Sequence, residues 1–416
     1  MKTSYLSAIT VCMVSTLQAQ SNTIQDLEAQ FLQNNYLLIA NKLNIDKADA
    51  EIVQEKLWNN PTLSISEVNL WKTYQIEEQP YLFGKYGKNQ QVSVELEQLI
   101  ETAGKRKKRV AIKQLEKNNA LFDYEELLRE LKKELRQSFY TLSRINQEEN
   151  QLQNLLNLFT QMSNQYERQS KLQNVSKADF YRIQTELLGL QKESVLLENE
   201  KIDGLNKLRL LTQNSELNID QLQFETSIKS QNQLPFDLKN SAKNQNIGLK
   251  KQGNELNLAK NQLILEKAQR TPDLTFQLNY DRGGNIMRDF VGVGVSVDLP
   301  IFNTNKGNIK AAKISIEQQL ANQNAYQLEL DQSIDRLQNQ LKKIEETLNF
   351  WSSEKEQEQN LMIENYKKHL QNKHITLMEF IDFTQAYREA QQAYLELQET
   401  YEHTYEELQY IVGKDF

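Results

Sequence analysis

Two carboxylates near the end of the chain are spaced so that they could act together. Glu379 lies three residues after Thr376, and Asp382 lies three residues after Glu379. Side chains three positions apart face the same side of a helix, so both acids would stand in its first two turns and attract cations. A structural interpretation is also open: Thr376 and Glu379 match a capping box, in which each side chain accepts a hydrogen bond from the other residue's backbone, and Asp382 is then merely solvated.

The three histidines do not predict a metal site. His369 and His374 are five residues apart, a rotation of about 140° on a helix, so they would share an ion only across a turn. His403 is isolated. The chain also has no HExxH pattern, no glycine-rich phosphate loop and no Ser/His/Asp set with an anchoring motif. We therefore predict neither enzymatic activity nor a cofactor.

The balance of charge excludes one class of partner. The formal net charge is −7, which gives no basic surface for nucleic acid. Basic residues do follow one another from Lys105 to Arg109. Two interpretations of this run are open: contact with lipid headgroups or phosphate, or an ordinary solvated stretch of charge.

Long helices must position these residues. The chain has five prolines, and residues 81–234 and 301–416 contain none of them, which permits very long helices. In both segments apolar residues recur in alternating steps of three and four, as in a coiled coil, for example at Leu128, Leu131, Leu135 and Leu142 and at Leu330, Ile334, Leu337 and Leu341. We expect two long helical hairpins, with tips near residues 174–179 and 373–379. Ser176 and Asp179 open the second helix of the first hairpin with the same capping spacing, and Arg182 follows.

Four short stretches predict strands instead of helices, at about residues 62–70, 91–99, 273–280 and 290–299. In the last of them apolar residues alternate with Gly292, Gly294, Ser296 and Asp298, which is the period of a strand with one apolar and one polar face. No stretch is long and apolar enough for a membrane helix, so a membrane location would require a closed barrel. Four strands leave two open edges, and other copies of the chain must close them into eight or twelve strands. The residues predicted to face lipid are Val291, Val293, Val295, Val297 and Leu299.

The chain has the pattern of a tandem duplication. Asn60-Pro61 and Thr271-Pro272 each end a helix before the first strand of a half. We expect a first repeat at residues 21–212, a connecting equatorial segment at 213–239 and a second repeat at 240–416. Residues 1–20 have the pattern of a signal peptide, so the mature chain would begin near Gln20 or Ser21. The only cysteine, Cys12, lies in that segment, and neither a disulfide nor a lipid anchor is expected.

This order of elements, together with the sequence Val-Asp-Leu-Pro-Ile-Phe at residues 297–302, resembles the TolC-like outer-membrane efflux proteins across almost the entire mature chain. The resemblance implies a mixed fold, mainly an α-helical coiled-coil tunnel, with four strands contributed to a transmembrane β-barrel of 12 strands in a homotrimer. It also implies a passive exit duct in the outer membrane that extends into the periplasm. Its partners would be outer-membrane lipid, a periplasmic adaptor and an inner-membrane efflux pump.

The resemblance assigns roles to the hairpin tips. Glu379 and Asp382 match the two acidic positions that line the family's periplasmic constriction, whereas Ile375 stands where the family has a gate arginine. Asp179 and Arg182 on the other tip are candidates for the same gate. Both tips lie at equal distances from the strands, so both are expected at the periplasmic end, where they would contact the adaptor through Asn174, Val175, Ser176, Lys373, His374, Ile375 and Thr376.

The segment from Glu97 to Arg106, with Arg109, further resembles the heavy-metal (cobalt, zinc, cadmium) efflux branch, although Ala103 stands where that branch often has glycine. Two alternatives come from other classes. A periplasmic adaptor has one long hairpin, whereas this chain predicts two. A coiled-coil structural protein of the cell envelope has no use for four alternating strands at matched positions of the repeats.

Overall fold

The computed structural model describes residues 22–66, 81, 91–224, 234–283, 287, 289–350, 362–363 and 365–416. The predicted signal peptide at residues 1–20 and the predicted strand residues 67–70 lie outside the described residues. The chain divides into two compact units. The tip unit comprises Met1–Ile39, Leu128–Lys239 and Ser333–Phe416, and the sheet unit comprises Ala40–Leu127 and Asn240–Gln332.

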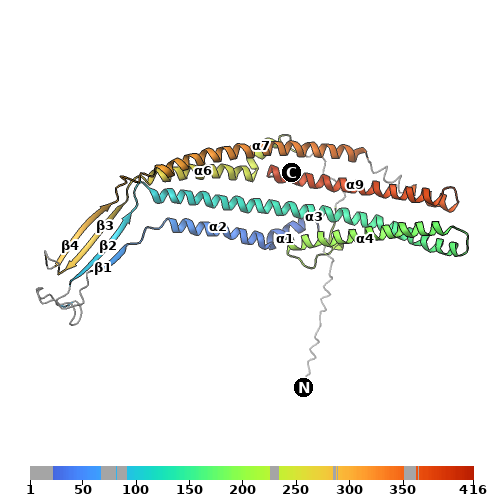
Figure 1. Cartoon of the computed structure of the whole chain (residues 1–416), viewed down its shortest axis with the longest axis horizontal. Coiled ribbons are helices and arrows are strands. Elements are labelled where there is room, and N and C mark those ends of the chain that lie inside the picture. The colour runs from blue at the N-terminus through green and yellow to red at the C-terminus, as the bar shows by residue number, and fades with distance from the viewer. Residues whose placement is uncertain are drawn as a thin grey trace, which may run out of the picture. The chain divides into compact units, whose positions relative to one another are not determined.

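The sheet unit contains a four-stranded antiparallel sheet in the order β1-β2-β3-β4 (Figure 1). The two halves of the sequence each supply one adjacent pair of strands, and β2 pairs with β3 where the halves meet. The sheet and the helices together confirm the predicted fold, which is mixed and mainly helical with four strands supplied by each chain. The strands are β1 (Thr62–Ser66), β2 (Val92–Ile100), β3 (Leu274–Arg282) and β4 (Asp289–Val297).

The register of the sheet separates apolar from polar side chains. Val293 pairs with Leu278, Leu278 with Leu96, and Leu96 with Leu63. Paired residues point to the same face, and alternate residues of a strand point to opposite faces. One face is therefore mainly apolar, and the other face carries mainly Thr, Ser, Glu, Gln, Asn and Gly. The first face also includes Gln98, Tyr280, Arg282 and Asp289; its apolar residues are Leu63, Ile65, Val92, Val94, Leu96, Ile100, Leu274, Phe276, Leu278, Val291, Val293, Val295 and Val297.

The longest helices follow the strands. Helix α3 runs for 67 residues without a proline, and its residues belong to both units. No helix among the described residues is both long enough and apolar enough to cross a membrane. The helices with complete bounds are α1 (Ile24–Asn34), α2 (Tyr36–Glu55), α3 (Lys105–Lys171), α4 (Lys177–Thr212), η1 (Ile219–Gln221), α5 (Leu238–Gln245), α6 (Ile247–Ala268), α7 (Lys306–Phe350) and α9 (Leu377–Val412). Residues 365–371 are helical as well.

Two helices are interrupted where the sequence predicts continuity. The single helix predicted before β1 is broken at Asn35, and the one predicted before β3 is broken at Asn246. Asn35 Oδ1 accepts from Leu38 N at 3.1 Å, and Asn246 Oδ1 accepts from Leu249 N at 2.7 Å. Each asparagine thus caps the helix that follows it. Its side chain accepts a hydrogen bond from a backbone N–H in the first turn of that helix, where the N–H groups lack helical partners.

The heptad residues form the core of the tip unit. Leu135, Leu142 and Ile145 of α3 and Ile334 and Leu341 of α7 are fully buried. Fully buried residues of the other helices join them, and Phe159 lies 6.2 Å from Phe380 between ring centroids. These apolar stripes are packing positions, as their spacing predicts. The fully buried residues on α4 and α9 include Ile183, Leu190, Leu208, Phe380, Tyr401 and Tyr405.

Candidate functional site: hairpin tips and a two-faced sheet

Both hairpin tips are built from the same backbone turn. Gln173 at the first tip has φ 61°, and Lys373 at the second has φ 57°. The next backbone N–H closes each turn, from Asn174 to Gln169 O at 2.9 Å and from His374 to His369 O at 2.8 Å. Left-handed residues of this kind usually are glycine at helix ends. Neither tip has glycine at this position, so the sequence gives no glycine signal for either turn.

Glu379 closes a complete capping box at the start of α9. Its Oε2 accepts from Thr376 N at 2.7 Å and from Thr376 Oγ1 at 2.9 Å, and its own N–H donates to Thr376 Oγ1 at 3.2 Å. The hydrogen bond from the Thr376 backbone, followed by that from its hydroxyl, lowers the pKa of Glu379. Glu379 and Asp382 are both exposed, so the first acid caps its helix and keeps its charge in solvent.

The first tip holds a weaker polar pair. Ser176 Oγ accepts from Asp179 N at 3.0 Å and donates to Asp179 Oδ2 at 2.7 Å. Arg182 Nη1 lies 3.4 Å from Asp179 Oδ1, with 51% and 32% of the two side chains exposed. Ion pairs this exposed contribute little to stability. Among the described residues, no hydrogen bond or ion pair joins this pair to Glu379 or Asp382.

The tip-contact residues predicted from the sequence surround these turns. Val175 and Ile375 occupy the same position of the two turns and are half-buried, whereas Asn174, Ser176, Lys373, His374 and Thr376 are exposed. His374 is not on the same helix as His369, because left-handed Lys373 lies between them. Their Nδ1 atoms are 3.3 Å apart. The turn that the two histidines would need in order to share an ion is therefore present.

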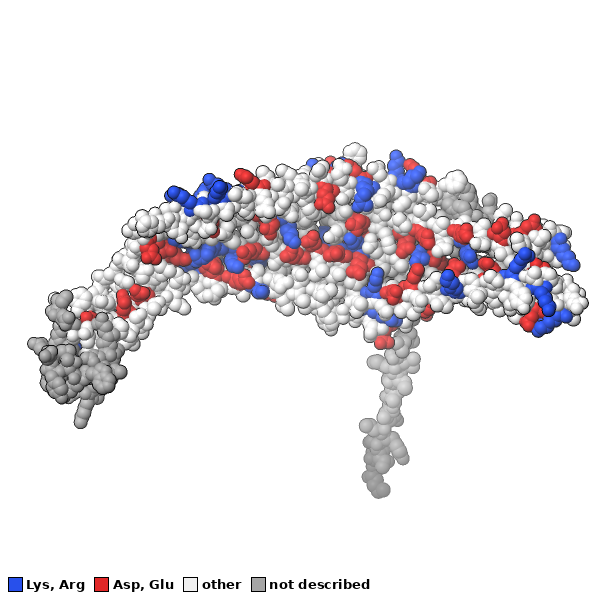
Figure 2. Space-filling model, in the orientation of Figure 1, with Lys and Arg blue, Asp and Glu red and all other residues white. Residues whose placement is uncertain are grey.

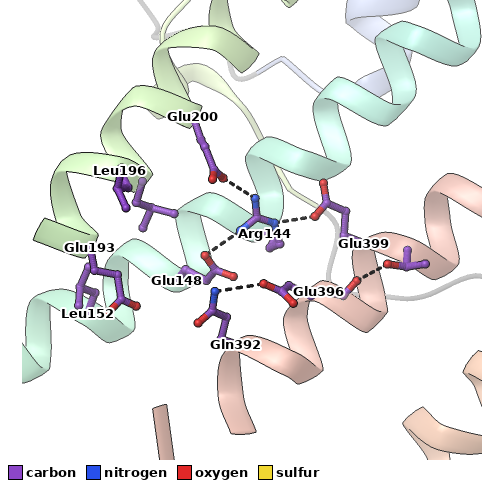
Figure 3. A pocket seen from close by; sticks show the side chains of 11 residues that line it. Arg144, Glu148, Leu152, Glu193, Leu196, Glu200, Gln392, Glu396 and Glu399 are labelled. Carbon is purple, nitrogen blue, oxygen red and sulfur yellow. Dashed lines mark hydrogen bonds and ion pairs between the residues drawn. The ribbon is translucent and has the colours of Figure 1, made fainter. Parts of the chain in front are cut away.

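A carboxylate cluster in the tip unit escapes the sequence argument (Figure 3). Arg144 of α3 lies 2.7 Å from Glu148, 2.7 Å from Glu200 of α4 and 2.6 Å from Glu399 of α9. Glu193 and Glu396 line the same pocket. Burial raises the pKa of Glu148, against the lowering effect of Arg144. The sequence shows only the four-residue spacing of Arg144 and Glu148, because the other acids come from distant segments.

The basic run at the start of α3 is part of the joint between strand and helix. Lys105 is 4% exposed, and its Nζ donates to Thr271 O and Asp273 Oδ2, both at 2.8 Å. The Arg106 guanidinium lies 3.9 Å above the Trp58 ring. Arg109 donates to both oxygens of Glu101, at 2.7 and 2.8 Å. The structure therefore gives these three residues intramolecular partners, a role that neither sequence interpretation anticipates.

The predicted lipid-facing row lies on the apolar face of the sheet. Val291 is 68% exposed, Val293 86% and Val295 58%. On the opposite face of β4, a Cβ on Gly292 would lie 2.6 Å from Asn279 Oδ1, so a side chain there would have to displace that amide. Figure 2 shows charged side chains dispersed over the helices and few on the visible part of the sheet. Leu299 is exposed but follows the end of β4 at Val297, two residues short of the predicted strand end.

No group of three or more His, Cys, Asp or Glu side chains that could hold a metal ion occurs in the described part of the chain. No curated protein matches the sequence. Residues 238–414 match the model of the family described as outer membrane efflux protein.

Solved structures of outer-membrane channels have the same fold. The chain is similar to CusC, with a TM-score of 0.76 and 14% identity over 94% of this chain and 92% of that one. It is similar to the CmeC outer membrane channel of Campylobacter jejuni, with a TM-score of 0.74 and 15% identity over 94% and 85%. The open state of the MtrE outer membrane channel of Neisseria gonorrhoeae gives a TM-score of 0.70 and 15% identity over 94% and 89%. Residues 238–414 thus match the outer membrane efflux protein family, and the chain as a whole has the fold of these outer-membrane channels.

Proposed function

We propose that this protein is the passive exit duct of a tripartite efflux system, in which an inner-membrane pump supplies the energy and a periplasmic adaptor joins pump and duct. The observation that supports this function best is the separation of the two faces of the sheet. An apolar face suits lipid, and a face rich in hydroxyls, amides and carboxylates suits a water-filled lumen. No catalytic step is required of the chain.

The open edges of the sheet support a homotrimer. β1 and β4 lie at its edges, and lipid offers no hydrogen-bonding groups to them. Four strands from each of three copies would close a barrel of twelve strands. The helices of the three copies would then continue the duct as a tunnel through the periplasm.

We place the gate and the adaptor contact at the hairpin tips. Glu379 and Asp382 face solvent one turn apart, so three copies would form two rings of carboxylates. Asp179 and Arg182 are assigned to the same constriction on the first tip. The adaptor would contact the turns at residues 174–176 and 373–376. Heavy-metal cations are the proposed cargo, supported by the acidic pair and by the resemblance of residues 97–106 to that efflux branch.

Three experiments test these proposals. Outer-membrane fractions should yield a trimer that resists heating in detergent, and a monomer in the soluble periplasmic fraction would contradict the duct. A deletion strain should become sensitive to cobalt, zinc or cadmium, whereas sensitivity confined to drugs would refute the metal cargo and leave the duct. Cysteines placed at Asn174 or His374 should crosslink to an adaptor, and their labelling from outside the cell would contradict the periplasmic placement of the tips.

A further inference from the structure

The second hairpin tip carries two imidazoles at the separation of two ligands of one metal ion. The Nδ1 atoms of His369 and His374 are 3.3 Å apart, and both side chains are exposed. Nitrogens bound to zinc at about 2.0–2.1 Å and at a tetrahedral angle lie about 3.3–3.4 Å from each other. We propose that His369 and His374 bind one divalent transition-metal ion of the zinc class through these two Nδ1 atoms.

The backbone of the turn already holds the two ligands in place. The N–H of His374 donates to His369 O at 2.8 Å, and left-handed Lys373 reverses the chain between them. The turn thus fixes the backbone of both ligand residues, and only their side chains would have to adjust on binding. Water would fill the remaining two positions of a tetrahedral ion, since among the described residues no third ligand is in place.

The first tip shows what the same turn does without histidine. Gln169 and Asn174 occupy the positions of His369 and His374, and Asn174 Nδ2 donates to Gln169 Oε1 at 2.8 Å. A polar contact across the turn is thus common to both tips. Only at the second tip are both partners residues that bind transition metals well.

The neighbouring charges limit the affinity. Lys367, Lys368 and Lys373 bring positive charge to the same turn, and two protein ligands hold an ion less firmly than the four of a structural zinc site. The ion should consequently exchange with solution. The site differs in this respect from a structural zinc centre.

The test uses the full chain in detergent, purified without a histidine tag. Co²⁺ is added as a coloured probe, Zn²⁺ is titrated against it, and one ion per chain is expected. The double variant His369→Gln/His374→Asn gives the second tip the side chains of the first, so the contact across the turn is kept while both ligands are lost. Zn²⁺ affinity should fall at least about tenfold in this variant, with an unchanged melting temperature in the absence of metal.

Two further variants complete the test. His403→Gln removes the remaining histidine and should leave Zn²⁺ binding unchanged. Gln169→His/Asn174→His should create a second site per chain at the first tip. Unchanged affinity in the His369→Gln/His374→Asn variant, or loss of binding in His403→Gln, would overturn the proposal. These measurements concern the purified chain, so their outcome is independent of whether the tip contacts an adaptor.

Discussion

The Glu379 carboxylate combines a structural and an electrostatic role. It completes the capping box of α9, and its charge remains exposed next to Asp382. Glutamine also serves at this position of a capping box, so Glu379→Gln removes the charge and keeps the cap. Combined with Asp382→Asn, it should reduce cation selectivity and divalent block of single-channel conductance in planar bilayers, with little change in melting temperature.

Glu389→Gln, an exposed change further along α9, is the matched control for this variant and should leave selectivity unchanged. Hydrogen bonds from Thr376 lower the pKa of Glu379 below its ordinary value of 4.5. In the single chain, Glu379 should accordingly stay ionised to a lower pH than an unperturbed glutamate does. A double variant with wild-type selectivity would place the constriction elsewhere.

Glu148 provides a test of pH dependence in the tip unit. Burial raises its pKa, so the folded state binds this proton more tightly than the unfolded state does. The stability from this group is then fully present below the unfolded pKa and is lost as the pH rises through the higher folded value. Glu148→Gln loses the ion pair with Arg144, but its effect on the melting temperature should be more favourable at pH 7.5 than at pH 5. Equal effects of Glu148→Gln at the two pH values would contradict this assignment.

Residues close in sequence were easier to predict than those brought together by folding. The capping box of Thr376 and Glu379 follows from a three-residue spacing, and the structure contains it. The acids around Arg144 come from three helices, so no local pattern could reveal them. The proximity of His369 and His374 depends on a left-handed residue that is lysine instead of glycine, which gives no turn signal.

Among the elements, the joint between β2 and α3 shows local backbone strain. Ala103 has φ 51° and is followed by Gly104 with φ 66°. The left-handed conformation costs a residue with a Cβ about 1 kcal/mol relative to glycine. Ala103→Gly should therefore raise the stability of the folded chain by up to that amount, measured by denaturant or thermal unfolding.

Gly104→Ala is the opposite change at the adjoining residue. A Cβ there would make only ordinary contact, 3.5 Å from Lys108 Nζ, so the backbone conformation decides the result. This variant should be destabilised by about 1 kcal/mol. Stabilisation by both changes, or by neither, would show that the joint does not keep this backbone conformation.

The packing of α6 against α7 within the sheet unit depends on one glycine. A Cβ on Gly248 would lie 1.9 Å from Tyr326 Oη, whose hydroxyl donates to Asn246 Oδ1 at 3.2 Å. Gly248→Ala should displace Tyr326 and break its hydrogen bond to Asn246, at a cost of about 1–3 kcal/mol. Gly253→Ala on the same helix meets its nearest atom at 3.7 Å and should stabilise the chain through helix propensity. Equal melting temperatures for the two variants would contradict this account.

Helix interruptions were harder to predict than helix lengths. The absence of proline and the heptad leucines suffice to predict α3 and α7, because both features repeat over many turns. The breaks at Asn35 and Asn246 depend on single side-chain bonds. Asparagine is only mildly unfavourable inside a helix, and a lone cap residue in an apolar repeat is a weak signal.

At the scale of the whole molecule, the sheet has the apolar surface that the proposed contact with lipid requires. Its apolar face continues across all four strands, from Leu63 and Ile65 of β1 to the valines of β4. The alternation in β4 predicted the face of each residue there, because a strand has a period of two. The pairing of β2 with β3 joins segments about 180 residues apart in sequence, such as Glu97 and Gln277. That pairing could not be obtained from periodicity.

The two sides of β4 can be compared with adjacent substitutions. Val295 pairs with Phe276 on the apolar face, and Ser296 pairs with Thr275 on the polar face. Arginine on a lipid-facing position near the bilayer midplane costs about 2–4 kcal/mol, whereas a lumen-facing arginine remains hydrated. Val295→Arg should therefore abolish most of the heat-resistant trimer in outer-membrane fractions, and Ser296→Arg should leave most of it intact. Both residues are exposed in the single chain, so neither change disrupts a packed core. Equal loss of trimer in the two variants would show that the apolar face does not meet lipid, and would then assign Val291, Val293 and Val295 to a contact between protein chains.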